Sequence, residues 1–196
     1  MVTEVITPRK WFLQFRVQQD EDLRSRPRYL DLADEALLVD CRYDLFRGPG
    51  PGGQKRNKTS NAVRLTHAPT GICVMAGESR SQAENKARAI RRLKLRLAVE
   101  IRHAIDPRGW EPPAWFGQVV QVGRLAVSHY NEHYARTAGL VLDLMDARKG
   151  SVGDVAKLLG VSTSSVVKFL EAEPQLWSAA NAIRKSAGQA PLEKRR

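Results

Sequence analysis

The stretch GPGPGG at residues 48–53 constrains the fold more than any other part of the sequence. Proline lacks a backbone N–H and bars the residue before it from helical angles, so the glycines that precede the two prolines are pushed toward extended backbone. Gly52 and Gly53 can adopt angles closed to other residues, and they let another backbone approach closely. The stretch is therefore predicted to be a narrow loop, nearly free of side chains, whose first functional group is the amide of Gln54.

Short elements of both kinds flank this loop. A helix is expected from Asp34, a good N-cap, and the composition of RYDLF at 42–46 is typical of a strand. Residues 62–77 hold an alternating segment, the turn PTG and a second apolar segment, which together predict a hairpin. Ser81 and Glu84 have capping-box spacing, so a long helix is expected through about Ala104.

On this long helix the apolar and basic side chains are expected on opposite sides. The predicted packing stripe consists of Ala83, Ala87, Ile90, Leu97 and Ile101. The far side is predicted to present the guanidinium groups of Arg88, Arg91, Arg92, Arg96 and Arg102.

The sequence indicates an α+β fold: a small mixed sheet with packed helices, followed by an all-helical C-terminal module. Residues 1–30 are a polar lead-in, 31–105 form the sheet-containing domain, 106–118 a proline-rich linker and 119–196 the helical module. Helical patterns cover about 119–147, 151–159, 163–171 and 174–187. Within the module, residues 151–170 resemble a helix-turn-helix, which favours a compact packing or docking unit over a DNA reader.

Charge and cysteine content narrow the class of protein. The net charge is +11, and residues 42–104 contribute most of it, with fourteen basic and four acidic residues. Such a concentration predicts a polyanion as partner. The two cysteines form no CxxC pair, so neither a disulfide scaffold nor a cysteine zinc site is expected, and a reducing cytoplasm is the natural setting. No signal peptide or membrane span is predicted.

The glycine loop also matches, formally, the G-x-G-x-x-G pattern of dinucleotide-binding proteins. Two prolines remove N–H groups that would face a pyrophosphate, no helix pattern follows the loop, and the acidic ribose partner is missing. Nucleotide binding is therefore disfavoured.

The frame GPGGQxxNKTxNAVRLTHxPTG, followed by Arg80-Ser81-Gln82 and Asn85-Lys86, resembles the catalytic domain of class I peptide chain release factors and of stand-alone ribosome-rescue proteins. The resemblance covers about 35–104. It implies that Gly52, Gly53 and Gln54 enter the peptidyl transferase centre of the large ribosomal subunit. There water attacks the ester of peptidyl-tRNA, and the Gln54 backbone N–H stabilises the oxyanion or the leaving 3′ oxygen.

The same resemblance implies ribosomal RNA contacts for a set of basic and polar residues. These are Lys55, Arg56, Asn57, Lys58, Arg64, Arg80, Lys86, Arg88, Arg91 and Arg92. Members of the family often carry an N5-methyl group on the glutamine, which makes a glutamine methyltransferase a candidate partner of Gln54. No cofactor or metal is otherwise expected, and a monomer is expected.

The chain also departs from full-length release factors, because no PxT-like or SPF-like codon-reading tripeptide occurs in a matching context. The expected function is therefore codon-independent ribosome rescue by peptidyl-tRNA hydrolysis. The alternatives are a non-catalytic ribosome or RNA binder and a helix-turn-helix DNA-binding regulator. His67 is expected to be a packed strand residue, and His129 and His133 are expected to be exposed helix residues rather than a metal pair.

Overall fold

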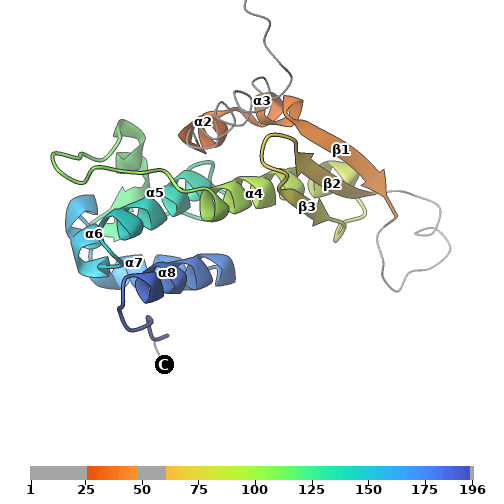
Figure 1. Cartoon of the computed structure of the whole chain (residues 1–196). Coiled ribbons are helices and arrows are strands. Elements are labelled where there is room, and N and C mark those ends of the chain that lie inside the picture. The colour runs from red at the N-terminus through yellow and green to blue at the C-terminus, as the bar shows by residue number, and fades with distance from the viewer. Residues whose placement is uncertain (1–25, 48–60, 195–196) are drawn as a thin grey trace, which may run out of the picture.

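The structure is a computed structural model that describes residues 26–47 and 61–194 (Figure 1). Within these ranges a three-stranded sheet with helices α2 to α4 precedes a mainly helical half. The elements of the first half are α2 (Arg26–Asp31), α3 (Asp34–Val39), β1 (Cys41–Phe46), β2 (Ala62–His67), β3 (Cys73–Ala76) and α4 (Gln82–Glu100). Those of the second half are η2 (Ala114–Val119), β4 (Val120–Gln121), β5 (Arg124–Leu125), α5 (Tyr134–Ala147), α6 (Val152–Leu159), α7 (Thr163–Glu171) and α8 (Pro174–Ser186).

The sheet has the order β1-β2-β3, and each neighbouring pair is antiparallel. The prediction of an α+β fold with a helical C-terminal part is confirmed, but the prediction of a mixed sheet is wrong. Helix α4 packs on β2 and β3 and leaves β1 at an edge, where Tyr43 and Leu45 stay partly exposed. One face of the sheet thus packs on α4, and Arg64 and Met75 on the opposite face are exposed.

Helix α4 begins as its sequence predicts, since the Ser81 hydroxyl accepts a hydrogen bond from the Glu84 amide. The helix ends at Glu100, one turn before the predicted Ala104. Its buried side differs from the predicted stripe: Ile90 and Leu97 are buried as expected, but Ala83 and Ala87 are exposed. The buried stripe runs instead through a four-residue spacing, Asn85, Ala89, Leu93 and Leu97.

The helical half centres on α5, most of whose residues are buried. It packs along α4 and α8, so α4 lies between the sheet and the rest of the molecule (Figure 1). The predicted helix over 119–147 is wrong in its first half, because η2 and the β4–β5 hairpin precede α5. The hairpin turn needs two residues with positive φ, and Val122 (47°) and Gly123 (67°) supply them.

The predicted helices at 151–159, 163–171 and 174–187 are present as α6, α7 and α8. Ser151 and Ser162 cap α6 and α7 through hydrogen bonds from amides three residues on. Gly160 ends α6 with a φ of 64°, which allows the sharp turn into α7. The β4–β5 hairpin is tied to this unit, because the Ser162 amide donates to the Gly123 carbonyl and the Leu125 amide donates to the Ser165 hydroxyl.

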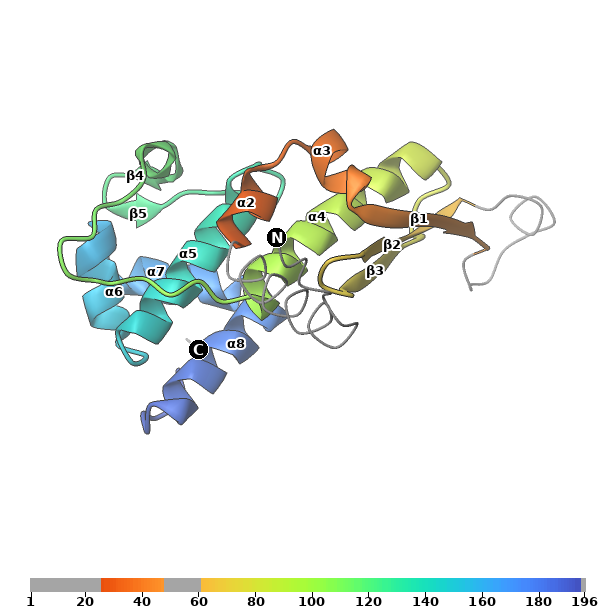
Figure 2. The same cartoon turned by 45° about the horizontal axis from the view of Figure 1, so that its top comes forward.

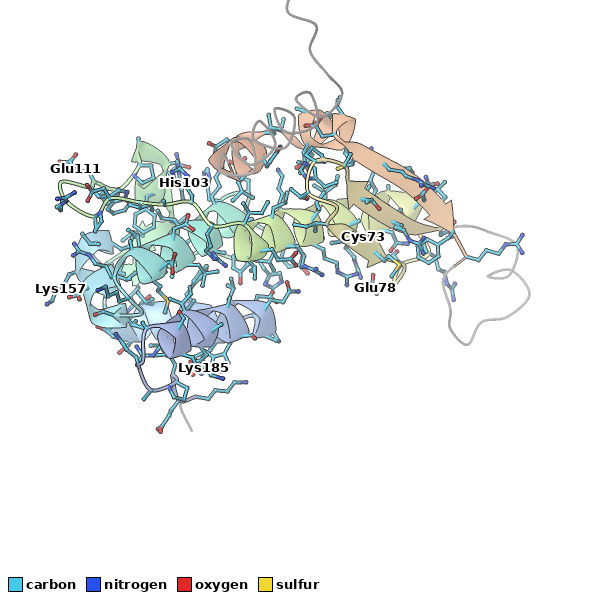
Figure 3. All side chains as sticks on the ribbon, viewed as in Figure 1. Cys73, Glu78, His103, Glu111, Lys157 and Lys185 are labelled. Atoms are coloured by element: carbon cyan, nitrogen blue, oxygen red, sulfur yellow. The ribbon has the colours of Figure 1, made fainter. Side chains whose placement is uncertain are left out.

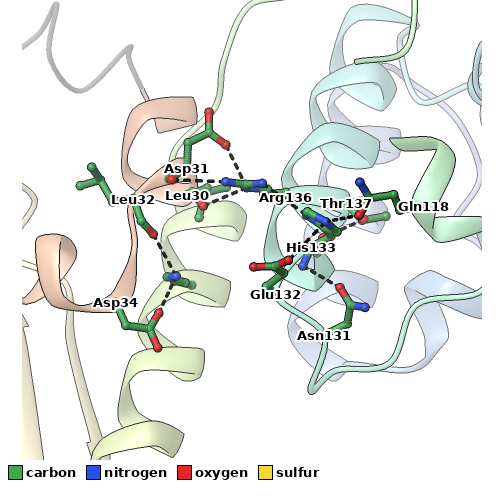
Figure 4. A network of polar contacts seen from close by, with 11 residues as sticks. Leu30, Asp31, Leu32, Asp34, Gln118, Asn131, Glu132, His133, Arg136 and Thr137 are labelled. Atoms are coloured by element: carbon green, nitrogen blue, oxygen red, sulfur yellow. Dashed lines mark hydrogen bonds and ion pairs between the residues drawn. The ribbon is translucent and has the colours of Figure 1, made fainter. Parts of the chain in front are cut away.

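The N-terminal segment of the described chain lies beside α4 and α5 (Figure 2), and two cations fasten it there (Figure 4). Arg136 on α5 donates to the Leu30 carbonyl at 3.1 Å and pairs with the Asp31 carboxylate at 2.9 Å. Lys94 on α4 donates to the Leu32 carbonyl and pairs with Asp34 at 2.7 Å. The α2–α3 segment is therefore held by charges on α4 and α5 together.

One cluster of buried apolar residues runs through both halves. The division of the chain into 31–105, a linker at 106–118 and 119–196 stays a prediction. Among residues 26–47 and 61–194, no helix has both the length and the apolar character needed to span a bilayer.

Candidate functional site

The predicted catalytic loop leaves and rejoins the sheet at a single place. Phe46, the last residue of β1, pairs with Ala62, the first residue of β2. The two chain ends that carry the segment 48–60 are thus held side by side. We call the pair Phe46 and Ala62, together with the neighbouring Asn61, the loop base. Outside the described residues lie the predicted loop positions Gly52, Gly53, Gln54, Lys55, Arg56, Asn57 and Lys58.

A buried asparagine on α4 fixes the loop base. The Asn85 amide nitrogen donates to the carbonyls of Asn61 and Ser79, each at 2.8 Å, and its oxygen accepts from the Ser79 amide at 3.0 Å. The side chain is fully buried. Asn61 in turn donates to the Arg80 carbonyl at 2.7 Å. Because each buried group has a partner, this small network holds the start of β2 against the turn before α4.

A second set of contacts holds the edges of the sheet to α4. Gln82 donates to the Tyr43 hydroxyl at 3.1 Å, which connects the first turn of α4 to β1. Arg92 donates to the Met75 carbonyl and pairs with Glu78 at 2.6 Å. Partial burial alone would raise the pKa of Glu78, but hydrogen bonds from Arg92 and from the Gly77 amide lower it overall. Glu78 lies at the sheet end of the molecule in Figure 3.

Two of the predicted RNA-contacting residues lie at the loop base. Arg64 is exposed on the face of the sheet opposite α4, and its guanidinium carbon lies 5.1 Å from the centre of the Phe46 ring. Arg80 is exposed, and its carbonyl is the partner of Asn61. The structure therefore brings Arg64 and Arg80 to the place where the segment 48–60 departs.

The remaining predicted contacts on α4 lie on two sides of the helix: Lys86 on one, and Arg88, Arg91 and Arg92, at three- and four-residue spacing, on another. Lys86 and Arg88 are two residues apart, so they leave the helix in nearly opposite directions. Arg92 is paired with Glu78 and hydrogen-bonded to β3. The guanidinium carbon of Arg91 lies 5.2 Å from the centre of the Tyr130 ring, which belongs to the second half.

The other two arginines of the predicted row, Arg96 and Arg102, are partly exposed and lie beside carboxylates. Arg96 pairs with Glu100, and Arg102 lies 3.8 Å from the Asp143 carboxylate. Both guanidinium groups therefore have a carboxylate beside them within the protein, while part of each side chain remains at the surface.

The histidines agree only in part with their predictions. His67 is fully buried, its Nδ1 lies 2.8 Å from the Thr70 hydroxyl, and its ring meets Tyr29 edge-on at 4.6 Å. Burial lowers the pKa of His67, with a smaller opposing effect from Asp40, so the ring is neutral at pH 7. This is the packed strand histidine that the sequence predicts.

His133 is not the exposed helix residue that the sequence predicts. It is buried beside the first turn of α5, stacks on Trp115 and lies 3.0 Å from the Gln118 side chain (Figure 4). His129 is exposed but precedes the helix. In the described ranges no three His, Cys, Asp or Glu side chains gather as they would around a metal ion.

Sequence reasoning missed the roles of Asn85, Asn61 and Tyr43. Asn85 was part of the motif that carries the family resemblance, but its amide could equally have faced solvent. The available signal was its place four residues before Ala89 and eight before Leu93, on the stripe that is buried.

Part of the chain is similar in sequence to known proteins. Residues 37–109 match the RF-1 domain family model. The chain is 47% identical over 78 residues to peptide chain release factor 1 of Acidiphilium cryptum, which is 40% of this chain and 22% of that protein. It is 52% identical over 67 residues to peptide chain release factor 2 of Campylobacter fetus, which is 34% of this chain and 18% of the relative.

The match spans only about a fifth of the length of these relatives. It covers the sheet, α4 and both sides of the loop base, and it ends before η2. This chain therefore contains an RF-1 domain, and through that domain it is related to the class I peptide chain release factors.

Proposed function

We propose that this protein acts as a release factor that promotes hydrolysis of the peptidyl-tRNA ester in the ribosomal peptidyl transferase centre, without reading a codon. The observation that carries the proposal is the RF-1 domain match around Gly52, Gly53 and Gln54. The flanking residues of this segment are held by the pairing of Phe46 with Ala62 and by the hydrogen bond from Asn85 to Asn61. A loop with both ends fixed in this way is suited to entering a narrow RNA channel from a rigid support.

The chemistry proposed for the loop is electrostatic stabilisation. The Gln54 backbone N–H donates to the oxyanion or the leaving 3′ oxygen, and the Gln54 side chain shapes the pocket for the attacking water. An oxyanion donor of this kind lowers the barrier by about 2.7–4 kcal/mol. No general base within this chain is required, and the neutral, buried His67 does not serve as one.

The basic residues of the domain are proposed to bind ribosomal RNA phosphates. Arg64 and Arg80 do so at the loop base, together with Lys55, Arg56 and Lys58 of the loop. We further propose that the protein works as a monomer in the cytoplasm, and that a methyltransferase modifies Gln54.

The absence of a PxT-like or SPF-like tripeptide in this sequence supports codon independence. The competing function is ribosome binding without ester cleavage, and the charge of residues 42–104 is equally compatible with it. Only a release assay separates the two.

The test is peptide release from purified ribosomes that hold peptidyl-tRNA, with a stop codon, a sense codon or no codon in the decoding site. Wild type is expected to release peptide in all three complexes. Gly53→Ala restricts the backbone angles that aim the Gln54 N–H and is expected to lower the rate by about a hundredfold or more. Gln54→Ala keeps that N–H and removes only the side chain that shapes the water pocket, so it is expected to lower the rate by a smaller factor. The matched control is Gln121→Ala, an exposed glutamine on β4, which is expected to act as wild type.

Equal release by wild type, Gly53→Ala and Gln54→Ala would refute the catalytic proposal. Tight, salt-sensitive ribosome binding without release in any complex would support the non-catalytic alternative. Release only with a stop codon would contradict codon independence.

A further inference from the structure

A pocket of about 610 Å³ opens between the β4–β5 hairpin, the segment before α5 and the helix α7. We call it the α7 pocket. Its volume lies in the range of small-ligand sites. Polar groups dominate one part of its lining: Arg124, Ser128, His129, Ser164, Ser165 and Lys168.

The α7 pocket suits an anion. Its lining residues include two cations, Arg124 and Lys168, and no carboxylate. Both cationic side chains are exposed, on β5 and α7 respectively. The N-terminal turn of α7 also faces the pocket through Ser164 and Ser165, where the helix dipole favours negative charge.

A buried hydroxyl of one lining residue also favours a bound anion. Tyr134 lines the pocket and is only 6% exposed, yet its hydroxyl has no hydrogen-bond partner among the described residues. Burial, with a smaller effect of Glu173, raises the pKa of Tyr134 to about 12, so the group stays an O–H donor. A buried donor without a partner is costly, and a bound acceptor would satisfy it.

A second cavity of the molecule differs from the α7 pocket in the charges of its lining. It has a volume of about 470 Å³ and lies between α2, α5 and residues 103–115. Its lining includes four carboxylates, Asp31, Asp106, Glu111 and Asp143, and one arginine, Arg136. With its excess of carboxylates, that cavity is less suited to an anion than the α7 pocket is.

An exposed aromatic platform adjoins the pocket. Tyr130 is 72% exposed, its ring lies 4.4 Å from that of the pocket residue His129, and Arg91 of α4 lies over it. Exposed aromatic rings beside cations are the usual means by which proteins stack the bases of single-stranded RNA. The platform also connects the pocket to the RF-1 domain, since Arg91 lies within it.

We propose that the α7 pocket and Tyr130 form a binding site for single-stranded RNA, with a backbone phosphate between Arg124, Lys168 and the start of α7. A neighbouring base stacks on Tyr130. The Tyr134 hydroxyl donates to the bound phosphate. The site belongs to the helical half and does not depend on release activity.

The test measures binding of the full chain to a fluorescent oligouridine of about 12 nucleotides as a function of salt. The double variant Arg124→Gln/Lys168→Gln is expected to bind about tenfold more weakly. Its plot of log affinity against log salt is expected to be shallower by about 0.7 for each lost phosphate contact. The matched control is Lys157→Gln/Lys185→Gln, two exposed lysines on α6 and α8 (Figure 3), which removes the same charge elsewhere.

Two further variants separate the parts of the site. Tyr130→Leu is expected to weaken binding about fivefold with the salt slope unchanged, because stacking is not ionic. Tyr134→Phe is expected to weaken binding about threefold without lowering the melting temperature, since it removes only an unpaired buried hydroxyl.

Equal affinity and salt slope in the Arg124→Gln/Lys168→Gln variant and its control would overturn the proposal. So would equally tight binding of a DNA duplex of the same length, or full displacement of the RNA by inorganic phosphate, which would assign the pocket to DNA or to a free anion. Gln54→Ala is expected to bind the RNA as wild type does. The outcome of the RNA-binding test therefore does not depend on the outcome of the release assay.

Discussion

The sheet half and the helical half of this protein are stabilised in different ways. The three-stranded sheet packs on α4 through one face only, and side-chain hydrogen bonds of Asn85, Gln82 and Arg92 hold its edges. In the helical half, α5 is buried along most of its length, and serine caps with a left-handed glycine set the turns. The half that leaves a face open also carries most of the excess positive charge, whereas residues 105–196 have 12 basic and 9 acidic residues, a net charge of only +3.

This difference matters for how binding surfaces arise. An open sheet face can present Arg64 without breaking a core, but its edge must then be held by specific polar contacts. The helical half gains stability from apolar packing, and its polar α7 pocket lies at its margin. We expect the sheet half to be sensitive to single polar changes and the helical half to be sensitive to lost volume.

The largest effect is expected from a cavity in the shared helix. Leu97→Ala removes a fully buried side chain of α4 and should lower the free energy of unfolding by about 3 kcal/mol. Because α4 packs on both halves, the sheet and the helices should unfold in one transition, measured by urea denaturation with probes in each half. Two separated transitions would show that the halves are independent.

A smaller effect is expected from the network at the loop base. Asn85→Ala leaves the Asn61 carbonyl and both backbone groups of Ser79 without this partner, at a cost of about 2 kcal/mol. Peptide release should fall together with stability, because the loop base is no longer fixed. The matched control is Asn131→Ala, whose side chain accepts one amide hydrogen bond in the helical half. Unchanged release by a folded Asn85→Ala protein would contradict the positioning role.

The smallest effect is expected from pH. His67 has an ordinary pKa of 6.5 that burial lowers in the folded protein, so the unfolded chain binds the proton more readily. Its contribution to stability is therefore present above pH 6.5 and is lost as the pH falls through the lowered pKa. Melting temperatures between pH 7.5 and 5 should fall less steeply in His67→Phe than in wild type, and parallel curves would contradict this assignment.

Much of the fold could be predicted where a local signal was strong. The Ser81 cap, the 62–77 hairpin and the helices α6 to α8 follow from residues close together in the chain. The β4–β5 hairpin could not be predicted, because its turn uses Val122 at a positive φ where asparagine is the usual signal. Apolar Val119 and Val120 then read as part of a helix.

The candidate site was predictable in composition but not in arrangement. The loop and its basic residues are evident from sequence, but Arg92, Arg96 and Arg102 turn out to pair with protein carboxylates. Arg96 and Glu100 are a local pair four residues apart on one helix, but Arg92 with Glu78 and Arg102 with Asp143 join residues 14 and 41 positions apart, which no local pattern encodes. The roles of Tyr130 and Tyr134 likewise depend on contacts that only the folded chain makes.

The position of α4 has a consequence for anyone who would excise the RF-1 domain. The helix packs on the sheet with one side and on α5 with another. Cutting the chain after residue 105 would therefore expose the apolar surface of α4 that α5 now covers. Such a fragment is expected to self-associate or to adsorb to apolar surfaces. The residues after 105 therefore shield the apolar side of the domain that precedes them from solvent.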